Sequence, residues 1–304
     1  MRKFLLSASF FYLFASGMVN AQSLEKYWDN SLSKYGLKGK NGSVVVSAKF
    51  DWVSPRENVN LYVVSANRKY GLIDATGKEL VPLSYDDISN FSEGLAKVSS
   101  NYMDGYIDQT GKLVIPMNFR DGSNFSEGLA SVAIEVKQGY STAKRYGFID
   151  KTGTMVIPAS YKQSGSFMGG LASVSEGFKW GYIDKGGKLV VPFTYQQAYN
   201  FYEGLAVVMN NDKYGYIDLQ GKVVIPLKYD YADGFSEGLA VVNLGGSPAF
   251  SGLPQGGKYG FINKTGSAVL PFKYDMARGF RKGKAEVEMN GAKYYIDKSG
   301  NEVK

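Results

Sequence analysis

The sequence repeats itself about every 34 residues, and this period constrains the fold more than any other feature. A strand signature with an aromatic residue before glycine recurs along the chain, with its glycines at positions 36, 71, 105, 147, 181, 215 and 260. Most steps between these glycines are 34 or 35 residues, and the two longer ones, of 42 and 45, mark insertions. A fixed period of this length is typical of proteins whose repeats bury their apolar surface against one another.

Each repeat reads as strands rather than helices. The clearest copy, LAVVMNNDKYGYIDLQGKVVIP at residues 205–226, contains apolar runs of four to six residues separated by turn residues. Such runs are rich in Val, Ile, Tyr and Phe, and Gly and Pro interrupt every copy, which favours strands and tight turns over a helical repeat of the same length. We therefore expect three antiparallel strands in each unit.

The turn between the second and third strands follows the pattern Asp-x-x-Gly. Aspartate accepts hydrogen bonds from its own turn and glycine adopts a positive φ at little cost, so the chain reverses there. A proline is expected to end the third strand, where its missing N–H does least harm on a sheet edge. The prolines stand at positions 82, 116, 158, 192, 226 and 271.

The strands are apolar on consecutive residues, so both faces of each small sheet should be covered. The predicted fold is all-β, with tandem three-stranded antiparallel meanders of about 34 residues that form either a β-propeller-like ring or an open β-solenoid. Seven such units and an N-terminal half unit, the hairpin from Tyr35 to Val46, fill a repeat domain at 34–304. The preceding segment, 22–33, is expected to form a short helical cap.

Spacers between the units carry aromatic residues at regular offsets. We predict that these side chains fill the seams between repeats, because an aromatic ring buries a large area; a sugar-stacking ladder is the alternative. The glycine after each Tyr or Trp is expected to leave room for a cross-strand aromatic ring. The spacer aromatics are Phe50, Tyr85, Phe119, Tyr161, Tyr195, Tyr229, Tyr274, Phe91, Phe125, Phe167, Phe201, Phe235 and Phe280.

The first 21 residues resemble a secretory signal. Arg2 and Lys3 precede an apolar run, and small residues end it at Ala21, where we expect cleavage. The run is too short to favour a membrane anchor, and no later stretch is apolar enough to span a bilayer. The sequence therefore predicts a protein exported to the periplasm or to the outside of the cell.

Composition excludes several kinds of chemistry. The chain has no cysteine and no histidine, which excludes disulfides, zinc sites of the Cys/His kind, and Ser-His-Asp or Cys-His catalysis. The formal charge is +7, and removing the signal leaves 33 basic against 28 acidic side chains. The lysines are scattered over turns, so no nucleic acid partner is expected, while an anionic glycan stays open as a ligand. Oligomeric state is left open.

Several recurring motifs resemble the WG-repeat family of bacterial proteins. The motifs are KWGYID, D-x-x-GK, VIP, Y-D-x-A and F-S-E-G-L-A-x-V, and together they cover essentially all of 34–304. The sequence departs from them at Asp104, Gly169 and Lys282, and only Trp180 keeps the Trp-Gly pair. The resemblance implies a β-repeat scaffold, often exported, with no catalytic residues to carry over.

Two insertions, 135–144 and 244–257, fall in the first turn of their units and supply the candidate binding residues. These candidates are Tyr140, Lys144, Arg145 and Phe250. Loops on one face of a repeat array commonly bind partners, although a tolerant turn also accumulates insertions without a function. No metal site and no cofactor are expected, since neither calcium loops nor a phosphate-binding loop is present.

The candidates for catalysis are a recurring row of glutamates and the aspartates of the Asp-x-x-Gly turns. Because these residues recur with the repeat, we interpret them as turn caps and salt-bridge partners. The function we predict is an exported, non-enzymatic scaffold that binds a protein or a glycan at the cell envelope or outside the cell. The alternatives are a carboxylate-dependent enzyme acting on polysaccharide and a purely structural spacer. The row consists of Glu93, Glu127, Glu203 and Glu237.

Overall fold

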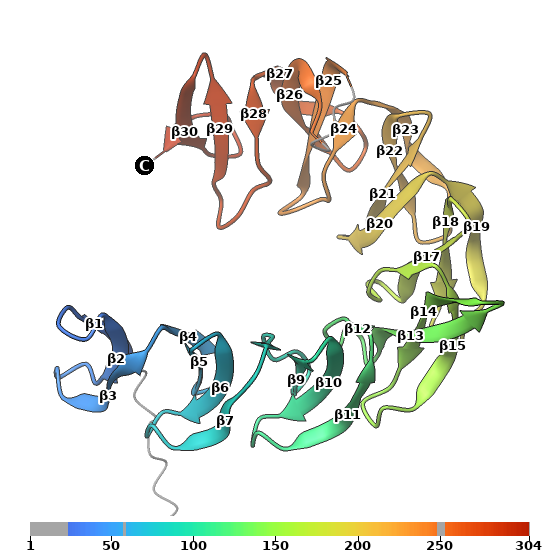
Figure 1. Cartoon of the computed structure of the whole chain (residues 1–304). Helices are drawn as coiled ribbons and strands as arrows, with labels where there is room; N and C mark the ends of the chain where they lie inside the picture. The colour runs from blue at the N-terminus through green and yellow to red at the C-terminus, as the bar shows by residue number, and fades with distance from the viewer. Residues whose placement is uncertain (1–23, 57–58, 248–252, 304) are drawn as a thin grey trace, which may run out of the picture. The chain divides into compact units, whose positions relative to one another are not determined.

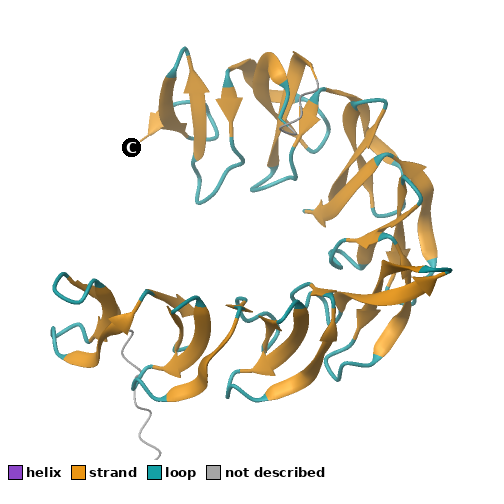
Figure 2. Ribbon diagram, in the orientation of Figure 1, coloured by secondary structure: helices purple, strands orange, loops and turns teal. Residues whose placement is uncertain are grey.

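A computed structural model describes residues 24–56, 59–247 and 253–303 of the chain. The predicted signal at 1–21 lies outside these residues. All regular secondary structure in the described part is β-strand, as Figure 2 shows, and the predicted all-β class is confirmed. The described residues contain no helix of the length and apolarity needed to cross a bilayer.

The chain divides into two compact units that meet between Leu83 and Ser84. The first unit holds a three-stranded sheet and a four-stranded sheet, each an antiparallel meander in sequence order. The last strand, β7, ends two residues beyond the division. The strands are β1 (Glu25–Asp29), β2 (Lys34–Lys38) and β3 (Val44–Phe50), then β4 (Trp52–Arg56), β5 (Leu61–Ala66), β6 (Lys69–Asp74) and β7 (Glu79–Tyr85).

The second unit consists of six four-stranded meanders, which we call blades and name by their strands (Figure 1). Blades β8–β11 and β12–β15 contain β8 (Asp87–Ile88), β9 (Leu95–Ser100), β10 (Met103–Asp108), β11 (Leu113–Phe119), β12 (Asp121–Gly122), β13 (Ala130–Gln138), β14 (Ser141–Ile149) and β15 (Met155–Tyr161). Blades β16–β19 and β20–β23 contain β16 (Gln163–Ser164), β17 (Leu171–Glu176), β18 (Lys179–Asp184), β19 (Leu189–Tyr195), β20 (Gln197–Tyr202), β21 (Leu205–Asn210), β22 (Lys213–Asp218) and β23 (Val223–Tyr229). Blades β24–β27 and β28–β31 contain β24 (Tyr231–Ala232), β25 (Leu239–Ser247), β26 (Gln255–Asn263), β27 (Ala268–Tyr274), β28 (Met276–Ala277), β29 (Ala285–Met289), β30 (Ala292–Ile296) and β31 (Glu302–Val303).

The structure adds a fourth strand to the predicted three-stranded unit. This strand comes from the spacer and pairs with the next strand of its blade, as Asp121 and Gly122 do with Ala133 and Val132. It is only two residues long in every blade of the second unit except β20–β23, where it has six. A two-residue strand shows no alternation of apolar and polar residues, so the sequence pattern could not reveal it.

The expected helical cap at 22–33 is wrong. Glu25–Asp29 form strand β1, which pairs antiparallel with β2 and turns the predicted half unit into a three-stranded sheet. After the strand, the Asp29 carboxylate accepts hydrogen bonds from the backbone N–H groups of Ser31 and Leu32 and so stabilises the turn into β2. Trp28 packs edge-on against Tyr35 across the pair, at 4.7 Å between ring centroids.

The proline was expected to end the third strand, but it lies in the middle of that strand. In β23 the strand continues past Pro226 to Tyr229, and the register with β22 shifts between Tyr214 and Tyr216, which marks a bulge. The strand pairs only with β22 and is an edge of its sheet, as predicted. A bulge on an edge strand accommodates a residue that cannot donate to the ladder.

The glycine that recurs after the aromatic residue is explained by this bulge. A Cβ on Gly215 would lie 2.6 Å from the carbonyl oxygen of Ile225, the residue before the proline. The space beside Gly215 is therefore filled by the backbone of the edge strand and not by an aromatic ring. The same clash, at 2.4 to 2.7 Å, would occur at Gly71, Gly105, Gly147 and Gly181. The expected ring is present at Gly36, where an added Cβ would lie 2.6 Å from the Tyr27 ring, and at Gly260, where it would lie 3.1 Å from the Phe272 ring.

The Asp-x-x-Gly turns form as predicted. Asp108 accepts hydrogen bonds through Oδ1 from the backbone N–H groups of Thr110 and Lys112, at 2.9 and 3.1 Å. Gly111 has a φ of 85°, a conformation that favours glycine. The turn thus fixes the register of β10 and β11 locally.

The hydrophobic core lies between successive blades, which confirms that both faces of the sheets are covered. In β21, Leu205 and Val207 pack toward blade β24–β27, while Ala206 and Val208 pack toward blade β16–β19. The spacer aromatics take part as predicted: Phe235 is buried and contacts Tyr216 with ring centroids 5.0 Å apart. Equivalent pairs at 4.9 to 5.1 Å occur at the other joints of the second unit: Tyr106 with Phe125, Phe148 with Phe167, Tyr182 with Phe201, and Phe261 with Phe280.

Candidate ligand-binding groove

The glutamate row links neighbouring blades. Glu203, in the turn between β20 and β21, accepts a hydrogen bond from the Gly238 N–H at 3.1 Å and pairs with Lys264 at 3.1 Å. Both partners belong to blade β24–β27, so the side chain joins two blades. The other pairings are Glu93 with Gly128 and Lys151, Glu127 with Gly169, Gly170 and Lys185, and Glu237 with Gly283 and Lys298.

These contacts set the ionisation of the row. Partial burial would raise the pKa of the Glu203 carboxyl, but hydrogen bonds from Lys264 and Gly238 outweigh it and hold that pKa below its ordinary value. The same balance lowers the pKa of Glu93 and Glu127. A catalytic acid needs a raised pKa, so the row is suited to joining blades, as the salt-bridge interpretation predicted.

Among the joints of the second unit, one lacks this link. Gly169 occupies the glutamate position in blade β16–β19, and Leu219 occupies the matching lysine position in blade β20–β23. A Cβ on Gly169 would lie 3.0 Å from Leu219 Cδ2, so the two residues are in apolar contact across the joint. The carboxylate and the ammonium are absent together at this joint.

The predicted insertion residues lie on extended hairpins. The first insertion lengthens β13 and β14 to nine residues each, and the second does the same for β25 and β26. Tyr140 is fully exposed at the first hairpin tip, and Lys144 lines a cavity of about 760 Å³ with Arg120 and Glu135. The Arg145 guanidinium donates to the Lys144 carbonyl oxygen, and Phe250 lies outside the described residues.

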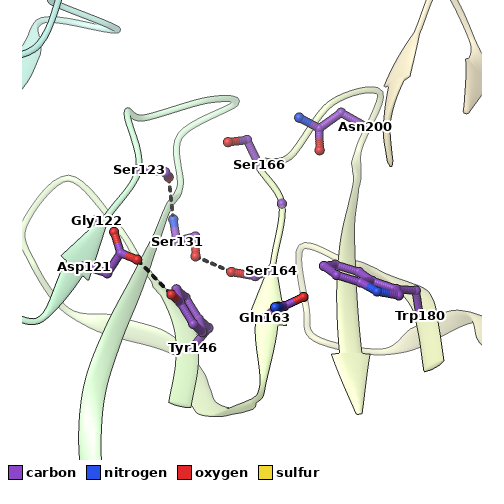
Figure 3. Close-up of a pocket in the computed structure, with 11 residues that line it drawn as sticks. Asp121, Gly122, Ser123, Ser131, Tyr146, Gln163, Ser164, Ser166, Trp180 and Asn200 are labelled. Carbon is purple, nitrogen blue, oxygen red and sulfur yellow. Dashed lines mark hydrogen bonds between the residues drawn. The ribbon is translucent and has the colours of Figure 1, made fainter. Parts of the chain in front are cut away.

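A different surface, which we call the Trp180 groove, gathers residues from three blades. It consists of two adjoining pockets of about 430 and 420 Å³ that share the indole of Trp180. Figure 3 shows the first pocket, with Trp180 reaching from β18 toward the strand that carries Gln163 and Ser164. The groove is lined by Asp121, Gly122, Ser123, Ser131, Tyr146, Gln163, Ser164, Gly165, Ser166, Ser173, Trp180, Gln196, Gln197, Ala198, Tyr199, Asn200 and Tyr202.

One end of the groove is fixed by hydrogen bonds between side chains. The Tyr146 hydroxyl donates to Asp121 Oδ2 at 2.7 Å, and the hydroxyls of Ser131 and Ser164 are hydrogen-bonded to each other (Figure 3). Burial, together with the hydrogen bond to Asp121, raises the pKa of Tyr146 to about 12. Tyr146 is therefore a neutral phenol at neutral pH, and this wall is held in place before any ligand arrives.

The middle of the groove depends on a glycine. A Cβ on Gly165 would lie 2.5 Å from both Asn200 Oδ1 and Ser173 Oγ, so only glycine lets these polar groups approach the strand. Asn200 comes from the blade after that of Gly165, and it extends the polar wall across the joint that contains Gly169 and Leu219. The joint without the ion pair thus lies beside the groove.

This arrangement suits recognition of a neutral polar ligand. The lining offers amides from Gln163, Gln197 and Asn200, hydroxyls from several serines, and a half-buried indole. Asp121 is its only charged side chain. An aromatic face contacts the C–H groups of a sugar, while amides and hydroxyls donate to and accept from its hydroxyls. The described residues contain no cluster of three or more His, Cys, Asp or Glu side chains that could hold a metal ion.

Sequence reasoning did not find the groove. Its residues are up to 81 positions apart, from Asp121 to Tyr202, and they meet only when three blades stack. The one available signal was Trp180, which alone keeps tryptophan at a position that elsewhere is mostly tyrosine.

Tandem β-meanders of one period, joined by recurring contacts, define a β-repeat protein. The sequence matches the family described as "WG containing repeat", and the chain belongs to that family, as the resemblance predicted. The matches cover residues 35–70, 70–102, 105–135, 146–179, 180–214, 214–247 and 259–291.

Solved structures of similar fold are distant in sequence. A crystal structure of a eukaryotic initiation factor is similar with a TM-score of 0.58 and 9% identity, over 93% of this chain and 84% of that chain. Kluyvelomyces marxianus Hsv2 gives a TM-score of 0.39 and 10% identity, over 73% and 89% of the two chains. The extracellular domain of a putative one component system from B. thetaiotaomicron gives 0.41 and 10%, over 92% of this chain and 47% of that one. The first likeness supports the fold alone. No curated protein sequence matches the chain.

Proposed function

We propose that this chain is an exported, non-enzymatic β-repeat scaffold that binds a glycan in the Trp180 groove, at the cell envelope or outside the cell. The observation that carries the proposal is the half-buried indole of Trp180 set among amides and hydroxyls in two adjoining pockets. The groove contains one carboxylate, Asp121, and Tyr146 already engages it.

Two further observations support a binding role over catalysis. The row glutamates are held by backbone N–H groups and lysines of the next blade, and the pKa of each carboxyl is lowered rather than raised. The sequence also lacks the histidine and cysteine that nucleophilic catalysis commonly uses. Export is supported by the basic and apolar residues before Ala21.

The test is binding of the chain from residue 22 onward to an array of neutral glycans, followed by titration calorimetry with the best oligosaccharide. The variant Trp180→Ala should weaken binding by about tenfold or more, because it removes the aromatic face. Trp52→Ala is the matched control, since Trp52 lies in the other unit and is 39% exposed. The Trp52→Ala variant should bind the oligosaccharide with the same affinity as the unaltered chain.

Three outcomes would count against the proposal. Absence of retention on every glycan would contradict glycan binding, and capture of an envelope protein through Trp180 would replace the glycan with a protein ligand. Release of shortened sugars from a bound glycan would show an enzyme. Export is tested separately, by fusing residues 1–21 to a reporter and finding whether it leaves the cytoplasm.

A further inference from the structure

A larger cavity is lined mainly by blades β24–β27 and β28–β31, with Tyr202 from blade β20–β23. Its volume is about 1030 Å³, and its lining differs in kind from that of the Trp180 groove. Its lining includes four tyrosines, namely Tyr202, Tyr231, Tyr259 and Tyr295. It also includes Arg278, Arg281, Lys282 and Lys284, against only two carboxylates, Asp233 and Glu286. We call it the tyrosine–cation cavity.

The tyrosines present both ring faces and hydroxyls. Tyr202 and Tyr295 are 43% and 49% exposed, and Tyr231 packs against Tyr259 with ring centroids 6.0 Å apart. Burial, together with the charge of Asp233, raises the pKa of Tyr231 to about 12, so its hydroxyl stays protonated at neutral pH. Rings that are partly exposed and held by neighbours offer contact area at little entropic cost.

Tyr202 is a departure from the repeat. Ser92, Ser126 and Ser236 occupy the same position in other blades, and each hydroxyl donates to a phenylalanine carbonyl oxygen of the following blade. Tyr202 instead lies against Gly234, where an added Cβ would be 2.7 Å from its ring. Tyr202 thus contacts the following blade through its ring and not through a hydroxyl, and the ring stays 43% exposed beside the cavity.

The cationic residues also depart from the repeat. In the turn between β28 and β29, Arg281, Lys282 and Lys284 stand where most other blades of the second unit carry serine, glutamate and leucine. All three are exposed, and the turn is closed by the Arg281 N–H, which donates to the Lys284 carbonyl oxygen. One of the two carboxylates, Glu286, already pairs with Arg278 at 3.6 Å. Residues that the repeat structure requires recur from blade to blade. Arg281, Lys282 and Lys284 do not recur, so the fold of the blade does not explain them.

Aromatic faces beside an excess of positive charge suit a sugar that carries an acidic group. A ring face accepts the C–H side of a pyranose, and a guanidinium or ammonium group binds its carboxylate. We propose that the tyrosine–cation cavity is a second binding site, which takes a uronic-acid unit of an acidic glycan. The site goes beyond the proposed function, since its residues, apart from Tyr202, and its ligand chemistry are distinct from those of the Trp180 groove.

The test is titration calorimetry with a short oligogalacturonate and with its methyl ester, which keeps the sugar rings and removes the charge. The unaltered chain should bind the acid at least about tenfold more tightly than the ester. The double variant Arg281→Gln/Lys282→Gln should lose about tenfold in affinity for the acid and little for the ester. Tyr295→Ala should weaken binding of both probes.

The control is the double variant Lys188→Gln/Lys222→Gln, which removes the same charge from two exposed turns outside the cavity. Its affinity for the acid should be unchanged. An equal loss in the control would mean that binding follows net charge alone, and equal affinity for acid and ester would remove the role of the cations. Binding of free galacturonate or acetate as tightly as the oligomer would mean an anion site without sugar recognition, and no binding of either oligomer would also overturn the proposal. Trp180→Ala should leave acid binding unchanged, so failure of the Trp180 groove and failure of this site are distinguishable.

Discussion

Two joints on either side of blade β20–β23 solve the same packing problem with different chemistry. Toward blade β24–β27, Glu203 binds the Gly238 N–H and pairs with Lys264. Toward blade β16–β19, Gly169 meets Leu219 and no charge is involved. Both joints keep the same aromatic pair beneath, Tyr216 with Phe235 and Tyr182 with Phe201, each at 5.0 Å.

The comparison distinguishes the contacts that every joint needs from a contact that strengthens only some joints. The aromatic pair and the apolar seam occur at both joints, so they hold the blades together. The glutamate link occurs at only one of them, so it adds to a joint that already forms. The joint without charges is the one beside the Trp180 groove, where Asn200 crosses between blades.

The largest expected effect comes from damaging the blade that both joints share. In Gly215→Val, the new Cβ would lie 2.6 Å from the Ile225 carbonyl oxygen and 2.8 Å from the Pro226 carbonyl carbon, neither of which can rotate away. We expect a loss of about 3 kcal/mol in the free energy of unfolding, measured by denaturant titration.

Lys213→Val is the control for this prediction. Lys213 is half-exposed and ion-paired with Asp230, so its replacement should change stability by less than about 1 kcal/mol. Equal losses for the two variants would contradict the bulge as the reason for the glycine.

The second effect concerns conversion of the apolar joint into a charged one. Leu219→Lys alone should destabilise the chain by about 1 kcal/mol, because a half-buried apolar side chain is lost. Adding Gly169→Glu should recover about 1 kcal/mol through the new pair, and a double-mutant cycle measures this coupling. The backbone permits the change, since Gly169 has a φ of 66° and the row glutamates have φ values of 51 to 54°.

Leu219→Gln serves as the matched variant, because it removes the apolar contact without supplying an ammonium group. Combined with Gly169→Glu it should show no stabilising coupling. A coupling as large as that of lysine would mean that the carboxylate acts only through the backbone N–H.

A smaller effect is expected when the charged joint is weakened. Glu203→Gln should cost about 1 kcal/mol at pH 7, and hydrogen exchange should rise at the Gly238 amide. The pKa of Glu203 lies below its ordinary value of 4.5, so its contribution is present above that pH and is lost as the pH falls through the lowered pKa of the folded state. The difference between variant and unaltered chain should therefore shrink as the pH falls below 4.5 and through the lowered pKa of Glu203.

Glu176→Gln, an exposed acid on β17 outside the row, controls for removal of charge alone. It should change neither stability at pH 7 nor exchange at Gly238. A Glu203→Gln penalty that stays constant over the whole acid titration would show that ionisation of this carboxyl does not matter.

The smallest effect belongs to the extended hairpin. Tyr140 is fully exposed at the tip between β13 and β14, away from both joints of blade β20–β23. Tyr140→Ser should shift the free energy of unfolding by less than about 0.5 kcal/mol in thermal or denaturant unfolding. A clear loss would reveal a contact that the insertion makes with the body of the repeats.

The parts of the fold that depend on local chemistry could be predicted from the sequence. Asp108 and Gly111 shape their turn through hydrogen bonds and a positive φ within four residues, so the motif alone indicates it. The strand after Pro226 could not be predicted, because the bulge that tolerates the proline is a property of the pair of strands. The fourth strand was hidden by its length.

The candidate groove was out of reach for a different reason. Ser131, Trp180 and Asn200 belong to three blades, and their proximity is decided by how the blades pack. The lysine partners of the glutamate row could more easily have been predicted from the sequence. In each blade that a row glutamate contacts, a lysine directly follows the first residue of the turn: Lys151, Lys185, Lys264 and Lys298. The paired absence at Gly169 and Leu219 carries the same signal.

That paired absence also bears on how a chain of near-identical modules finds its proper order while folding. If blade β20–β23 packed against blade β12–β15, in place of blade β16–β19, Glu127 would face the Leu219 side chain instead of Lys185. If blade β24–β27 packed against blade β16–β19, Lys264 would face Gly169, which has no side chain. Each wrong pairing leaves a charged side chain without its partner, and this disfavours it relative to the native order of blades. The one joint of the second unit that differs from the others thus favours the native order of blades whose sequences are otherwise similar.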